Sequence, residues 1–128
     1  MSAGFICKLN SFTVTAEDLL TVIEGLEIKP NDQAFFEQAA LLALAKFRDR
    51  TPLFKIAVNL RLIALANVLR TSTEPAFFRR RDGRVPIDRA LLAAVAAAPM
   101  VVGADNAPGF DVADLLRLAR DLGSAPSP

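Results

Sequence analysis

"TPLFKIAVNLRLIALANVLR", residues Thr51 to Arg70, is the stretch of sequence that decides the fold. Thr51 is a suitable N-cap, and Pro52 follows at the first helical position, where its missing N–H group costs nothing. On a helical wheel almost every other position is apolar, apart from Arg61 and a narrow polar stripe: Lys55, Asn59, Asn67 and Arg70. The pattern predicts a helix that is either the central helix of a bundle or the helix of a dimer interface.

Two helices are predicted before this stretch. "TAED" places Thr15 as an N-cap and Asp18 as the reciprocal acid of a capping box, so a helix is expected over residues 16–27. Apolar residues recur with helical periodicity over residues 32–49, which predicts an amphipathic helix there. Residues 5–15 alternate in part between apolar and polar side chains, so they are expected to form a short β-hairpin or an extended arm.

Three helices are predicted after it. "TSTEPAFFRRRDG" reads as a short helix that is capped at Ser72 or Thr73 and stopped at residues 82–83. "VPIDRALLAAVAAAP" predicts a helix between the prolines at positions 86 and 99, followed by a loop with one short extended piece. "FDVADLLRLARDLG" predicts a last helix, with Asp111 as its N-cap.

The fold class predicted from these elements is all-α, a single compact bundle of five to six helices around a central apolar helix, with a short β-hairpin or arm at the N-terminus. A chain of 128 residues suits one domain. That domain is expected over residues 1–123, with residues 124–128 as a disordered tail. Because 52% of the residues are hydrophobic, some are expected to be buried against another chain.

Several residue types that carry chemistry are missing. The chain has no histidine, tyrosine or tryptophan and only one cysteine. A zinc site, a Ser-His-Asp triad, a Cys-His pair and a disulfide framework are therefore excluded within one chain. We predict no catalytic residue, no metal site and no cofactor, and the one cysteine, Cys7, is expected to be reduced and buried.

The sequence shows no targeting or membrane signal. "MSAGFICKLNSF" lacks the basic and long apolar regions of a signal peptide. The most apolar stretch, residues 53–69, contains two charged side chains and is shorter than the roughly 20 residues that span a bilayer. We expect a cytoplasmic protein without membrane contact.

Charge is unevenly distributed along the chain. Residues 1–45, 46–89 and 90–128 carry net charges of −4, +7 and −2. The basic middle segment contains one candidate partner-binding cluster: Arg79, Arg80, Arg81, Arg84 and Arg89. These arginines could bind an acidic protein or nucleic-acid phosphates, or could merely solvate a helix end. Three consecutive arginines spread over about 200° of a helix, so they cannot all face one ligand.

Arg61 lies on the apolar side of the central helix, where an unpaired charge is costly. In one interpretation its guanidinium extends along the apolar surface to reach solvent, or pairs with a carboxylate such as Glu24 or Glu37. The other makes it the binding residue for a small anion in a central pocket.

These features favour a non-enzymatic protein–protein interaction or assembly module that binds another copy of itself or an acidic protein. The main alternative is a nucleic-acid-binding regulator that uses the cluster of residues 79–89. A third hypothesis is a binder of small anionic ligands around Arg61.

Overall fold

The computed structural model describes residues 3–23, 33–71, 89–103 and 106–123. They form six helices and one two-stranded hairpin, which confirms the all-α prediction. The elements are α1 (Ala3–Asn10), α2 (Ala16–Ile23), α3 (Gln33–Lys46), α4 (Pro52–Thr71), α5 (Arg89–Ala97), β1 (Val101–Val102), β2 (Pro108–Gly109) and α6 (Val112–Gly123). The short helix predicted at residues 72–83 and the predicted tail at 124–128 lie outside the described residues.

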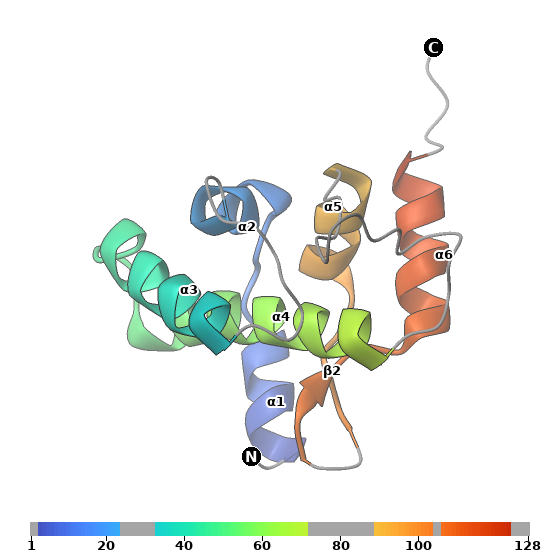
Figure 1. Ribbon diagram of the computed structural model, residues 1–128, viewed down its shortest axis with the longest axis horizontal. Coiled ribbons are helices and arrows are strands. Elements are labelled where there is room, and N and C mark those ends of the chain that lie inside the picture. Colours follow the sequence, from blue (N-terminus) through green and yellow to red (C-terminus); the bar gives the residue numbers. More distant parts are fainter. Residues whose placement is uncertain (1–2, 24–32, 72–88, 104–105, 124–128) are drawn as a thin grey trace.

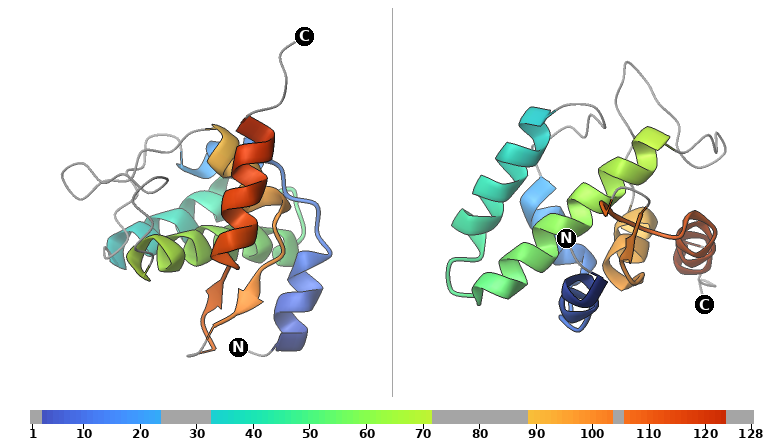
Figure 2. Two further views of the ribbon diagram at one scale, coloured as in Figure 1. Left: turned by 90° about the vertical axis from the view of Figure 1, so that its right-hand side faces the viewer. Right: turned by 90° about the horizontal axis from the view of Figure 1, so that it is seen from below.

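Helix α4 crosses the middle of the molecule, as predicted (Figure 1). Helix α1 and the hairpin lie on one side of it, α2, α5 and α6 lie on the other, and α3 runs beside it (Figure 2). Its apolar side chains fill the core because neighbours surround most of its circumference. The α4 side chains in the core are Phe54, Ala57, Val58, Leu60, Leu62, Ala64, Leu65, Ala66 and Val68.

Three of the predicted helix N-caps are confirmed, whereas the one at Ser72 or Thr73 lies outside the described residues. The N–H of Thr15 donates to Asp18 Oδ2 at 3.0 Å, and the N–H of Asp18 donates back to Thr15 Oγ1 at 3.1 Å. These two bonds make the reciprocal capping box at the start of α2. Thr51 Oγ1 accepts from the N–H of Phe54 at 3.3 Å. Asp111 Oδ1 accepts from the N–H of Asp114, also at 3.3 Å.

The β-hairpin or arm expected over residues 5–15 is wrong, because residues 3–10 form α1. Ile6 and Leu9 are buried and Phe5 packs against the core, whereas Cys7 and Lys8 are exposed. Apolar residues spaced by three and four positions share one face of a helix, and this spacing outweighs the partial alternation. The expectation that Cys7 is buried is therefore wrong as well.

The hairpin lies near the C-terminal end of the chain instead. Val101 pairs with Gly109 and Val102 with Pro108 in an antiparallel register. Asn106 allows the reversal between them, with φ of 57°, a left-handed conformation that asparagine tolerates better than most residues. The loop expected after α5 thus contains two short extended pieces rather than one.

Candidate functional site

The predicted arginine cluster is only partly visible, since Arg79, Arg80, Arg81 and Arg84 lie outside the described residues. Arg89 begins α5 and forms an ion pair with Glu17 of α2. Both side chains are more than half exposed, so the pair stabilises the fold weakly. At this position the basic segment, residues 46–89, pairs with the acidic segment, residues 1–45, of the same chain. The uneven distribution of charge alone did not show whether the basic segment binds a partner or another part of the fold.

Arg61 is buried, with 3% of its surface exposed. Its Nη1 donates to the main-chain oxygens of Val95 at 2.8 Å and Ala98 at 2.6 Å. Both oxygens lie at the C-terminal end of α5, where carbonyls lack partners within the helix and a positive charge is favourable. Burial lowers the pKa of the guanidinium from its usual value, although arginine stays protonated at neutral pH.

The described partners of Arg61 are therefore carbonyls rather than the expected carboxylates. Glu37 is exposed on α3, and Glu24 lies outside the described residues. The arginine joins the central helix to the end of α5, and its Nε has no hydrogen-bond partner.

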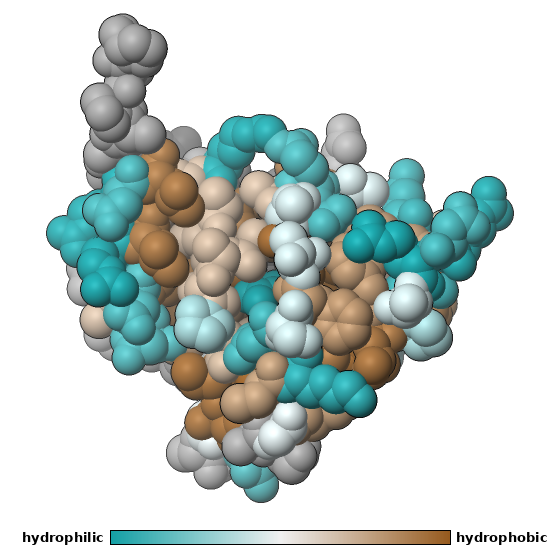
Figure 3. Space-filling model, turned by 180° about the vertical axis from the view of Figure 1, so that it is seen from behind, coloured by the Kyte–Doolittle hydropathy of each residue, from teal (hydrophilic) through white to brown (hydrophobic). Residues whose placement is uncertain are grey.

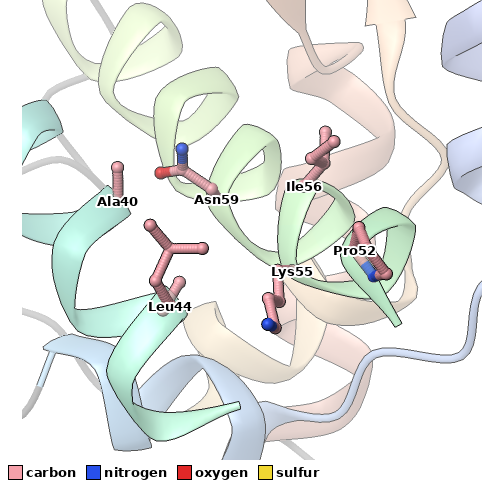
Figure 4. A pocket seen from close by; sticks show the side chains of 7 residues that line it. Ala40, Leu44, Pro52, Lys55, Ile56 and Asn59 are labelled. Atoms are coloured by element: carbon pink, nitrogen blue, oxygen red, sulfur yellow. The ribbon is translucent and has the colours of Figure 1, made fainter. Parts of the chain in front are cut away.

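A groove of about 370 Å³ lies between α3 and α4. Leu44 and Lys55 lie at one end of it, and Ala40 and Asn59 lie at the other (Figure 4). Its remaining lining residues are Ala43, Pro52 and Ile56. The walls are mostly apolar, with one amide and one ammonium group among them.

Large apolar side chains are exposed at this groove and next to it: Leu44 and Ile56 line it, and Leu41 lies one helical turn from Leu44 on α3. Leu41 is 66% exposed, Leu44 55% and Ile56 38%. Two other large apolar side chains are exposed in the described part of the chain, and they lie apart, on β1 and α6. On the face seen from behind, hydrophilic side chains separate the apolar areas (Figure 3). We call the surface formed by the groove and the exposed side chains of Leu41, Leu44 and Ile56 the α3–α4 face.

The corner that joins α3 to α4 is held by aromatic contacts and is basic. The rings of Phe47 and Phe54 meet edge to face, with centroids 5.4 Å apart. The guanidinium of Arg50 lies over the Phe54 ring, 3.6 Å from its centroid, in a cation–π contact. Lys46 and Arg48 are also exposed at this corner, which has only one carboxylate, that of Asp49.

Asn59 contributes an unsatisfied polar group to the groove. Its side chain points from α4 toward Ala40 of α3 (Figure 4). Its Oδ1 is buried and accepts no hydrogen bond. A buried acceptor without a donor destabilises the free chain by about 1–3 kcal/mol.

Two features are absent from the described part of the chain. No helix there combines the length and the apolar character needed to cross a bilayer. In that same part of the chain, no three His, Cys, Asp or Glu side chains gather where they could hold a metal ion.

Comparison with known proteins gives no match: no family model, no curated protein and no solved structure is significantly similar to this chain. The site must therefore be interpreted from its own geometry.

Sequence reasoning did not identify the α3–α4 face. Leu41, Leu44 and Ile56 have the same residue types as the core, and helical periodicity does not say which apolar positions a neighbour covers. The available signal was the wide apolar arc of residues 32–49, which exceeds what one neighbouring helix can bury.

Proposed function

We propose that this chain is a non-enzymatic protein–protein interaction module whose contact surface is the α3–α4 face. The observation that carries the proposal is the exposure of Leu44 and Ile56, which line one apolar groove, together with that of Leu41, one helical turn from Leu44 on α3. Apolar side chains that cluster on a surface are a common mark of a protein interface. A partner that covers them gains free energy in proportion to the apolar area removed from water.

The shape of this face favours a protein partner over a small molecule. Small-molecule sites are concave and enclose most of the ligand, whereas Leu44 of the groove and Leu41, one helical turn away on α3, stand more than half exposed. A protein surface can cover both the protruding leucines and the hollow between the helices. The basic corner at Lys46, Arg48 and Arg50 gives this surface a polar rim, as interfaces commonly have.

The nucleic-acid and small-anion hypotheses stay predictions. Arg89 and Arg61, the described residues on which they depend, each bind a partner within the chain. No other described contact favours either hypothesis.

Photocrosslinking in the cells that produce the protein tests the proposal. A photoreactive phenylalanine analogue replaces Leu44 in one variant and Leu122 in the matched control, because both are exposed leucines on helices. We expect discrete protein adducts from position 44 that are absent at position 122 and weaken when Ile56→Asp is added. Equal adducts at both positions, or none at position 44, would refute the proposed surface.

A further inference from the structure

We propose that the occupant of the groove is a second copy of this chain, placed by a two-fold axis that passes close to Asn59. The inference rests on the proposed function and names the partner of the same face. In this dimer the α3–α4 hairpins of two copies pack face to face and antiparallel, as in a four-helix bundle. Each copy then presents the same surface to the other, which is the usual arrangement in homodimers.

The charges along the face are arranged for such a pairing. Glu37, Leu41 and Leu44 are spaced by four and three residues, so they form one stripe along α3. Glu37 is exposed at the end of this stripe farther from the corner. Lys55 lies at the opposite end of the groove, beside Leu44 (Figure 4).

An antiparallel two-fold arrangement places Glu37 of each copy against Lys55 of the other, so the dimer contains two such pairs. A parallel arrangement would instead bring the two basic corners together, where like charges repel. The distribution of charge therefore selects the antiparallel orientation.

Asn59 lies on the groove between these two charged ends. Ala40, which faces Asn59, is one helical turn along α3 from Glu37, and Lys55 is one turn from Asn59 along α4. The two-fold axis that pairs the charges thus brings the two Asn59 side chains close to each other. A carboxamide carries both donors and an acceptor. Because Asn59 Oδ1 is buried in the single chain, the side chain has to rotate toward the second copy before two facing asparagines can satisfy one another.

That rotation gives the unpartnered Oδ1 of Asn59 a donor from the second copy. A single buried asparagine in an apolar helix interface fixes the register and orientation of the helices at some cost in stability. The same residue that is unsatisfied in the free chain would define how two copies align.

The dimer is expected to be weak. Few large side chains are exposed on the face, and small interfaces belong to the transient class of complexes. We expect a micromolar rather than a nanomolar dissociation constant.

Charge reversal tests the orientation. Glu37→Lys and Lys55→Glu are each expected to weaken self-association about ten-fold, because each change turns two attractive pairs into two repulsive ones. In an equimolar mixture, both pairs between the two variants are attractive again. Sedimentation equilibrium of the mixture should therefore show a heterodimer at least as tight as the wild-type dimer, with Lys8→Glu on α1 as the control that leaves dimerisation unchanged.

Two results would overturn the inference. One is a wild-type chain that stays monomeric up to about 1 mM, well above micromolar dissociation constants. The other is a mixture that associates no better than either variant alone. If adducts from position 44 then contain only other proteins, the proposed function stands and the second copy is excluded. If position 44 gives no specific adduct, the proposed function fails too.

Discussion

Arg61 of α4 holds the end of α5 through the main-chain oxygen of Ala98, which lies 2.6 Å from its Nη1. A second bond from the same nitrogen reaches Val95 O at 2.8 Å. The buried cation thus replaces the solvent that would otherwise satisfy the carbonyls at this helix end. The central helix positions α5 by a polar contact as well as by apolar packing.

Replacement of Arg61 tests this contact. Arg61→Met fills a similar volume but leaves both carbonyls without their donor, so we expect the free energy of unfolding to fall by about 2–3 kcal/mol. Arg61→Lys keeps the positive charge, so its free energy of unfolding should fall by less. Urea denaturation followed by circular dichroism measures both, and an Arg61→Met variant as stable as the wild type would contradict the role.

Replacing each of the two asparagines of α4 is expected to change the free energy of unfolding in opposite directions. Asn59→Leu removes a buried acceptor without a donor and should raise the free energy of unfolding by about 1 kcal/mol. Asn67→Leu removes the donor that reaches Pro108 O at 3.0 Å, so it should lower that free energy by about 1–2 kcal/mol. Both are measured on dilute, monomeric protein, and a loss of stability for Asn59→Leu would show that its amide is satisfied.

Asn10 joins α1 to the hairpin. Its Nδ2 donates to Met100 O at 2.9 Å, and its Oδ1 accepts from the N–H of Met100 at 2.8 Å. Asn10→Ala breaks both bonds, so the free energy of unfolding should fall by about 2 kcal/mol. Ser11→Ala is the control, since Ser11 is exposed and bonds only within the end of its own helix. Equal losses for the two variants would contradict a joining role for Asn10.

The capping box of α2 gives a local prediction. Thr15→Ala removes the acceptor for the N–H of Asp18 and should cost about 1 kcal/mol of unfolding free energy. Thr13→Ala, at an exposed position ahead of the helix, should change it little. Thermal unfolding compares them, and similar melting temperatures for both variants would show that the cap contributes nothing.

Much of the fold follows from the sequence because helix signals are local. Thr15, Thr51 and Asp111 mark helix starts by their own side-chain chemistry, and the structure confirms all three. The central place of α4 follows from its nearly continuous apolar surface. Phe5, Cys7 and Leu9 misled the interpretation of the N-terminus because a short segment can fit both the strand and the helix period.

The site was less predictable because it depends on what covers each residue. Arg61 is conspicuous in the sequence, yet its partners are main-chain oxygens, which no residue type reveals. Leu44 and the buried Leu65 look alike in the sequence, and only the arrangement of neighbouring helices exposes one and buries the other.

The most direct test of the α3–α4 face is the molar mass of the protein across a concentration series, measured by light scattering on three chains. The wild type and Leu122→Asp should both rise from the monomer mass of 13.8 kDa toward twice that value. Leu44→Asp should stay monomeric, because a charge in the centre of the face opposes its burial. If Leu44→Asp associates as the wild type does, the α3–α4 face is not the surface through which this protein associates.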